Sequence, residues 1–174
     1  MIDVVLGLDV SSSKVGLAII DFDHKLLKFQ LTKFNSKKPL EERCSELEQV
    51  VLAIAKQYSI KEVYIEAPFM MFSGGKTTAM TMSKLQRFNG MVSYMIHRLL
   101  GQNAELIAAN KARGLVGLKI KRGEDTKKKI IEWVAAKYPQ NFIVEMTRYG
   151  NPKPGTDDMA DAIVVALAGL NHKE

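Results

Sequence analysis

The sequence has a single cysteine, Cys44, and lacks any apolar run near the roughly 20 residues that a membrane-spanning helix requires. One cysteine excludes an internal disulfide bond and a cysteine-rich zinc site. The N-terminal Met1-Ile2-Asp3 also lacks the basic residues with which a signal peptide begins. From these absences we expect a protein of a reducing cytoplasm with no membrane partner.

No internal repeat or low-complexity tract interrupts the 174 residues, of which 47% are hydrophobic and 25% are charged. This composition is typical of a globular protein. The length suits one domain that buries a core of its own. We therefore expect a single domain over residues 1–174.

Positive charge is concentrated in one segment, from Lys111 to Lys129. The segment holds eight basic and two acidic residues, so the whole net charge of +6 falls within it. The basic residues are Lys111, Arg113, Lys119, Lys121, Arg122, Lys127, Lys128 and Lys129. Such a segment on a neutral body favours a surface that binds a polyanion, above all a nucleic acid. The alternative is a solvated lysine-rich surface.

The hydrophobic pattern predicts a mixed α/β sheet with helices on both faces. Three strands joined by tight turns open the chain and predict an antiparallel unit; alternating helices and strands follow. The expected strands cover residues 4–9, 15–21, 25–32, 62–66 and 104–108, and the expected helices cover 39–58, 78–100, 110–116, 124–138 and 156–169. Thr156 is the expected cap of the last helix and Gly169 its end. Residues 142–144 could form a further strand.

Four acidic residues stand in otherwise apolar elements. Asp9 and Glu66 each end an apolar strand, and Asp158 and Asp161 lie three residues apart on one face of the closing helix. Two like charges about 4 Å apart repel by roughly 4 kcal/mol at an effective dielectric near 20. A divalent cation would offset that repulsion, and carboxylate oxygens without sulfur or clustered imidazole select Mg²⁺ or Mn²⁺ rather than zinc. The pattern indicates a metal-dependent enzyme.

Three segments carry a resemblance to a known family. Gly7–Ala18 resembles the opening hairpin of ribonuclease H-like nucleases, and Tyr64–Met70 resembles the second acidic motif of the RuvC family of Holliday junction resolvases. Asp158–Ala162 is similar to that family's closing Asp-x-x-Asp-Ala helix. The resemblance implies a single RuvC-like nuclease domain with a ribonuclease H-like mixed sheet, three antiparallel strands then parallel ones. It further implies a homodimeric, Mg²⁺-dependent endonuclease that cuts four-way DNA junctions by paired nicks in a bacterial or phage-infected cell.

The same resemblance implies roles for individual residues. Asp9, Glu66, Asp158 and Asp161 would be catalytic and hold two Mg²⁺ ions, with Mn²⁺ as the alternative. Lys127 would also be catalytic, since it matches the family's lysine near the scissile phosphate. Phe69 matches a phenylalanine that wedges against junction bases in that family. The implied DNA-contacting residues are Phe69, Lys76, Lys111, Arg113, Lys119, Lys121, Arg122 and Lys128. Residues 73–78 lack the spacing of a phosphate-binding loop, so no nucleotide cofactor is expected.

Two other functions are compatible with the same residues. A ribonuclease H-like nuclease acting on RNA or branched DNA, similar to proteins of the YqgF type, would share the opening hairpin. A non-catalytic junction-binding protein is the third possibility, although four acidic residues near phosphate would weaken its binding. A sugar kinase or actin-like ATPase shares the hairpin, but 174 residues cannot hold its two lobes. The segment of residues 140–155 is longer than the corresponding segment of bacterial RuvC-family proteins, which favours a divergent, phage-type member of that family.

Overall fold

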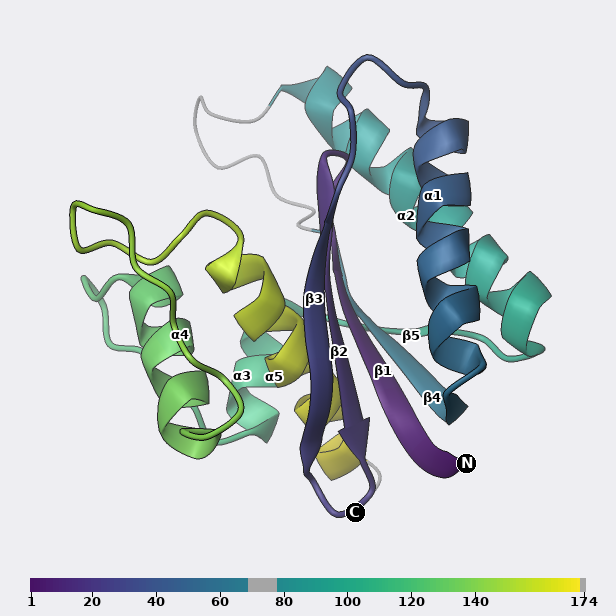
Figure 1. The fold of residues 1–174 in the computed structure, drawn as a ribbon. Coiled ribbons are helices and arrows are strands. Elements are labelled where there is room, and N and C mark those ends of the chain that lie inside the picture. Colours follow the sequence, from purple (N-terminus) through teal and green to yellow (C-terminus); the bar gives the residue numbers. More distant parts are fainter. Residues whose placement is uncertain (69–77, 173–174) are drawn as a thin grey trace.

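A five-stranded mixed sheet forms the centre of the molecule (Figure 1). The computed structural model describes residues 1–68 and 78–172. The strands are β1 Ile2–Val10, β2 Lys14–Asp21, β3 Leu26–Lys33, β4 Tyr58–Glu66 and β5 Glu105–Ile107. Their spatial order is β3-β2-β1-β4-β5, antiparallel from β3 to β1 and parallel from β1 to β5. The predicted arrangement of three antiparallel strands followed by parallel ones is confirmed.

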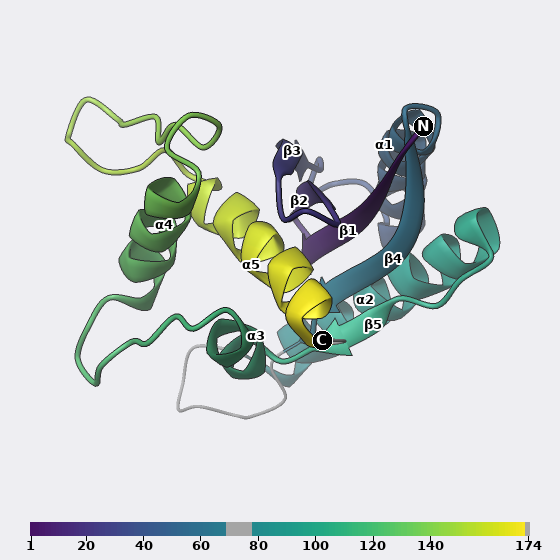
Figure 2. The same cartoon turned by 90° about the horizontal axis from the view of Figure 1, so that it is seen from below.

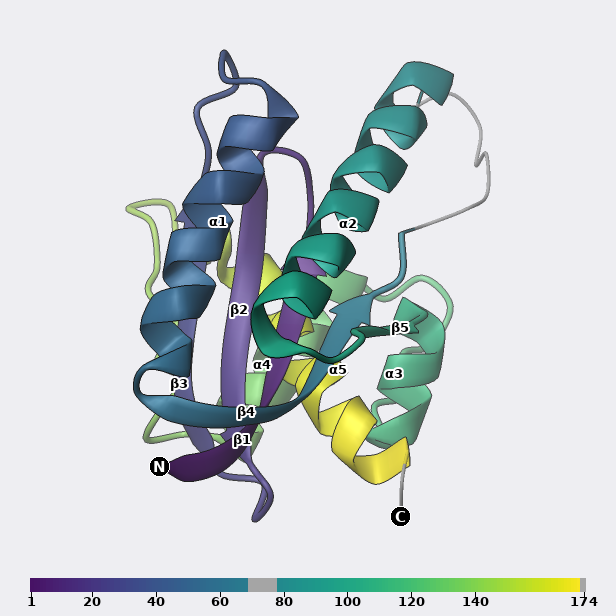
Figure 3. The same ribbon diagram turned by 90° about the vertical axis from the view of Figure 1, so that its right-hand side faces the viewer.

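Helices cover both faces of this sheet. The helices are α1 Leu40–Ala55, α2 Ala79–Leu100, α3 Ala109–Leu115, α4 Thr126–Lys137 and α5 Thr156–His172. Helices α1 and α2 lie side by side over one face (Figure 3). Helix α5 crosses the other face against β1 and β2, with α3 and α4 packed outside it (Figure 2). The helices on both faces that the sequence predicts are therefore present.

Side chains of the central strands point alternately to the two faces of the sheet, which divides the hydrophobic core into two layers. In β1, Val4, Leu6 and Leu8 pack with residues of α1 and α2, whereas Val5 packs with residues of α5. Successive side chains of a strand point to opposite faces of the sheet. Asp9 therefore belongs to the α5 side, two pleats beyond Val5. A carboxylate at the end of this strand faces the one helix that carries further acidic residues.

Two glycines let α5 approach the sheet closely. A Cβ atom at Gly7 would lie 2.2 Å from the Ala162 carbonyl oxygen, and one at Gly16 would lie 2.1 Å from the Asp158 carbonyl oxygen. Both distances are far inside van der Waals contact, so any side chain at either position would push α5 away from β1 and β2. Because glycine has no side chain at these two positions, the first turns of α5 pack against the end of β1.

Three details of the secondary structure differ from the sequence prediction. Helix α1 ends at Ala55, and its expected last residue, Tyr58, begins β4 instead. Residues 142–144 form no strand, because they pair with none of the five strands of the described sheet, although Phe142 packs inward against Phe29 and Ile143 is exposed to solvent. Helix α5 runs past Gly169, since this glycine gives space to the Tyr64 ring rather than ending the helix.

The cap predicted for α5 is also wrong. Thr156 is itself the first residue of α5, and its hydroxyl group donates a hydrogen bond of 2.7 Å to the Lys153 carbonyl oxygen. Across the part of the chain that the structure describes, no helix has both the length and the apolar character needed to cross a membrane.

Candidate active site

The parallel pairing of β1 and β4 places Asp9 and Glu66 side by side. The register matches Leu8 with Ile65, and the two acidic residues follow directly on neighbouring strands. Both are partly buried and belong to the α5 side of the sheet. Ends of parallel strands are where active sites of α/β sheets gather.

Helix α5 adds three more acidic residues from its first turns. Asp158 is buried with 9% of its surface exposed, and Asp157 and Asp161 are partly buried. We call the five residues Asp9, Glu66, Asp157, Asp158 and Asp161 the acidic cluster. The structure thus brings together all four predicted acidic residues and adds Asp157, which the sequence prediction missed.

Electrostatic coupling within the acidic cluster is strong. Burial raises the pKa of Asp9 well above its ordinary value, and the four neighbouring carboxylates raise it further. Burial, with the charges of Glu66, Asp157 and Asp158, raises the pKa of Asp161 from 3.8 to about 8. Burial also raises the pKa of Glu66, although the positive charge of Arg113 opposes this shift. At neutral pH Asp161 therefore keeps a proton that a bound cation would replace.

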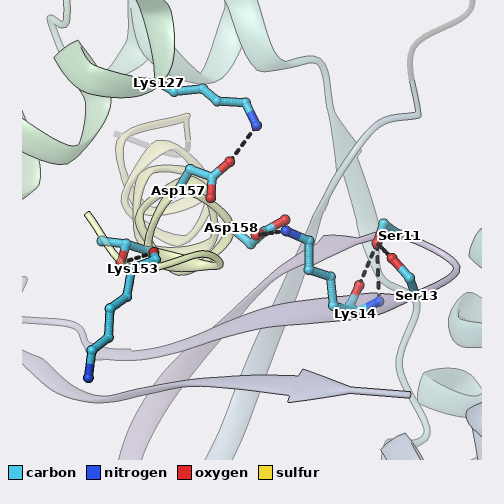
Figure 4. Close-up of polar contacts among 8 residues, drawn as sticks. Ser11, Ser13, Lys14, Lys127, Lys153, Asp157 and Asp158 are labelled. Carbon is cyan, nitrogen blue, oxygen red and sulfur yellow. Dashed lines mark hydrogen bonds and ion pairs between the residues drawn. The ribbon is translucent and has the colours of Figure 1, made fainter. Parts of the chain in front are cut away.

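Two lysines already neutralise part of the cluster (Figure 4). Lys14 Nζ on β2 lies 2.5 Å from Asp158 Oδ2, and Lys127 Nζ on α4 lies 2.6 Å from Asp157 Oδ2. Burial would raise the pKa of Asp157, but the hydrogen bond and charge of Lys127 outweigh it and lower that pKa. The predicted Lys127 thus reaches the acidic cluster, whereas Lys14 is a contact that the sequence prediction missed.

Oxygen ligands in the acidic cluster suit a hard divalent cation such as Mg²⁺. Asp158 Oδ2 is buried and accepts no hydrogen bond, despite the nearby ammonium group of Lys14. Within residues 1–68 and 78–172, no three His, Cys, Asp or Glu side chains already form a set that could hold a metal ion. Asp158, one of the four predicted ligands, and the neighbouring Asp157 are instead turned toward lysines. The donor chemistry fits Mg²⁺, and a metal would have to compete with these ammonium groups.

A basic groove lies next to the acidic cluster. It has a volume of about 570 Å³ and its lining includes Arg113, Lys119, Lys121 and Arg122. Arg113 connects the groove to the cluster, because its charge lowers the pKa values of Glu66 and Asp161 against the effect of burial. Four of the predicted DNA-contacting residues therefore share one concave surface beside the carboxylates.

The other predicted DNA-contacting residues lie elsewhere. Lys111 Nζ is 3.3 Å from His172 Nε2 at the far end of α5. Lys128 lines a second groove of about 670 Å³, together with Lys127, Lys153 and Asp157. Phe69 and Lys76 lie outside the described residues, so their predicted contacts with DNA stay predictions.

A mixed sheet of this strand order, with α5 on one face and α1 and α2 on the other, is a ribonuclease H-like fold. No family model and no curated protein sequence matches the chain. Among solved structures, the chain is similar to Thermus thermophilus RuvC in complex with Holliday junction substrate. The TM-score is 0.71 at 17% identity, over 98% of this chain and 94% of that one.

Two further resolvases have similar structures. The yeast mitochondrial Holliday junction resolvase Ydc2 matches with a TM-score of 0.55 and 13% identity, over 96% of this chain and 77% of that one. The fowlpox virus resolvase in complex with Holliday junction DNA matches with a TM-score of 0.51 and 17% identity, over 98% of each chain. At these identities the comparison establishes a RuvC-like fold.

Proposed function

We propose that the protein is a Mg²⁺-dependent endonuclease that resolves four-way DNA junctions by paired nicks. The observation that carries the proposal is the convergence of Asp9, Glu66, Asp158 and Asp161 from two strands and one helix. The RuvC-like fold adds support, since two of the similar structures contain Holliday junction DNA.

The four predicted carboxylates would hold two divalent ions, Mg²⁺ or Mn²⁺. Such ions, when bound, activate water as a nucleophile and neutralise charge at the reacting phosphate. The protein's own part is to fix ligand positions on a rigid sheet and a closely packed helix. Asp9 and Glu66 are held by strand pairing, and Asp158 and Asp161 by the approach of α5 over Gly16.

Basic residues around the acidic cluster would hold the DNA backbone. Lys127, which contacts Asp157 at 2.6 Å, would orient the phosphate next to the cluster once this contact is released. Arg113, Lys121 and Arg122 would bind phosphates along the adjoining basic groove. Contacts of this kind give affinity that falls with salt and supply no base specificity.

We further propose that the active form is a homodimer, because a two-fold dimer matches the symmetry of a four-way junction. Helix α2 supports this proposal through its large exposed apolar side chains. Met80 is 82% exposed and Tyr94 is 67% exposed. Sedimentation velocity should give twice the 19.4 kDa mass of one chain. Sedimentation as a monomer across the concentration range used for cleavage would contradict the dimer.

A substrate panel tests the proposed activity. Labelled four-way junction, linear duplex and RNA–DNA hybrid are each incubated with the protein in Mg²⁺ or in EDTA. Junction-restricted nicking that requires Mg²⁺ is the expected result. Cleavage of the hybrid alone would instead assign a ribonuclease H-like activity, and tight junction binding without nicking would assign a non-catalytic binding protein.

Two variants connect the activity to the site. Asp9→Asn should abolish nicking while preserving junction binding, because it removes a ligand and a negative charge near phosphate. Asp3→Asn is the matched control, since Asp3 lies on the same strand, has a side chain that is 57% exposed and lies 3.6 Å from the Lys61 ammonium group at the surface. Retained nicking by Asp9→Asn would contradict the assignment of the site.

A further inference from the structure

We infer that Lys14 is the internal counterion of the acidic cluster and sets its affinity for divalent metal, which must displace the ammonium group from Asp158. The inference rests on the proposed metal site and concerns a residue outside the predicted ligand set. It identifies Lys14 as a positioning residue that acts on the site through Asp158.

The position of Lys14 follows from the pleat of β2. Ala18 and Ile20 of this strand pack with residues of α5. Lys14 lies an even number of residues before them, so its side chain is on the same face of the sheet and extends toward the same helix. The nearest backbone of α5 belongs to Asp158 and lies directly over Gly16. A lysine two residues before that glycine therefore reaches the first turn of α5 (Figure 4).

A rigid turn holds the base of the Lys14 side chain. Ser11 accepts a hydrogen bond from the Lys14 backbone N–H at 3.2 Å and donates from its hydroxyl group to the Lys14 carbonyl oxygen at 2.9 Å. Arg43, which is 3% exposed, donates to the Ser12 carbonyl oxygen at 2.5 Å from α1. The turn is thus fixed from two directions, whereas the four-carbon stem of Lys14 remains free to change rotamer.

The contact with Asp158 differs from an ordinary surface ion pair. The Asp158 side chain is 12% exposed, and that of Lys14 is 31% exposed. Exposed pairs contribute little to stability, but removing the partner of a buried carboxylate leaves an uncompensated charge. Lys14 therefore stabilises the acidic cluster while the cluster holds no metal.

The same contact opposes metal binding. The Lys14 ammonium group lies 2.5 Å from Asp158 Oδ2, an oxygen that a metal ion would use as a ligand. A cation entering there would meet both the positive charge and the volume of the ammonium group. Because Lys14 is partly exposed and on a flexible stem, it can move into solvent when a cation takes its place.

Metal binding without DNA tests this role. Mn²⁺ is titrated by isothermal calorimetry into the wild type, Lys14→Met, Lys14→Arg and the control Lys33→Met. Lys33 is the register partner of Lys14 on β3 and is exposed, so its replacement removes the same charge from the neighbouring strand. Lys14→Met should bind Mn²⁺ about tenfold more tightly, a change of roughly 1.4 kcal/mol. Lys14→Arg and Lys33→Met should stay within about twofold of the wild type.

Thermal unfolding supplies the second readout. In EDTA, Lys14→Met should lower Tm by about 4 °C, and saturating Mn²⁺ should restore it to the wild-type value. Lys14→Gln, which retains polar character, repeats both measurements and decides the outcome if Lys14→Met does not fold.

The possible failures are distinguishable. A wild type that binds no Mn²⁺ would overturn both the metal site and the role of Lys14. Binding by the wild type with unchanged or weaker affinity in both Lys14→Met and Lys14→Gln would overturn only the role of Lys14.

Discussion

Replacing Asp161 with asparagine tests the electrostatic character of the acidic cluster, because the change removes a charge and preserves the shape of the side chain. Burial, together with the negative charges of neighbouring carboxylates, raises the pKa of Asp161 from 3.8 to about 8. At pH 7 the folded protein therefore keeps a proton that the unfolded chain has lost. Folding without metal must take up this proton.

The size and sign of the effect follow from the two pKa values. Each pH unit above the pKa of Asp161 in the unfolded chain lowers the free energy of unfolding by about 1.4 kcal/mol. At pH 7 this penalty amounts to about 4 kcal/mol. Relaxation of the protein and contact of the site with water reduce this penalty, and about 2 kcal/mol remains if half of it is lost. The penalty is absent below pH 4, where both states are protonated, grows as pH rises, and levels off above pH 8.

Melting curves in EDTA at pH 4, 7 and 8.5 measure this effect. Asp161→Asn should raise Tm by roughly 4 to 8 °C at pH 7, by slightly more at pH 8.5 and by almost nothing at pH 4. Asp3→Asn, at an exposed position of β1, is the control and should change Tm little at any of these pH values. A variant that is less stable than the wild type at pH 7, or equally stabilised at all three pH values, would refute the reasoning.

Three further predictions concern packing, DNA contact and pH. Gly16→Ala should lower stability by about 1 to 3 kcal/mol and abolish nicking, because its Cβ would lie 2.1 Å from the Asp158 carbonyl oxygen. Gly114→Ala, where a Cβ meets nothing within 4 Å, should leave both unchanged or raise stability slightly, and equal effects of the two would contradict the close approach of α5. Arg122→Gln should weaken junction binding and reduce the slope of log affinity against log salt by about one, whereas an unchanged slope would remove Arg122 from the DNA surface. Nicking at subsaturating Mg²⁺ should increase with pH up to about 8, since metal must displace the proton of Asp161; a rate that falls over this range would contradict the raised pKa.

Local sequence patterns were sufficient to predict the five strands of the sheet, apart from the start of β4, and the positions of the four predicted acidic residues. Asp9 and Glu66 end short, β-branched apolar runs that predict buried strands, and parallel pairing of those strands places the carboxylates side by side. The spacing of Asp158 and Asp161 gives one helical face wherever the helix packs. Each of these inferences needs only the period of a strand or helix.

Contacts that form only when distant segments of the chain pack together could not be predicted from the sequence. Lys14 meets Asp158 because α5 lies directly on Gly16, and nothing in the separate segments states that distance. Gly169 looked like a helix end, yet it gives space to the Tyr64 ring within a helix that continues to His172. A glycine that permits close packing and a glycine that ends a helix are identical in the sequence.

Mapping the nicks on a fixed four-way junction tests the proposed nuclease site most directly. Each of the four strands is labelled in turn and incubated with the wild type or Asp9→Asn in Mg²⁺. The wild type should nick two strands of like polarity at symmetric positions near the branch point, and Asp9→Asn should bind the same junction without nicking it. Nicks scattered along the duplex arms, or the same paired nicks from Asp9→Asn, would contradict a junction-resolving site built on the acidic cluster.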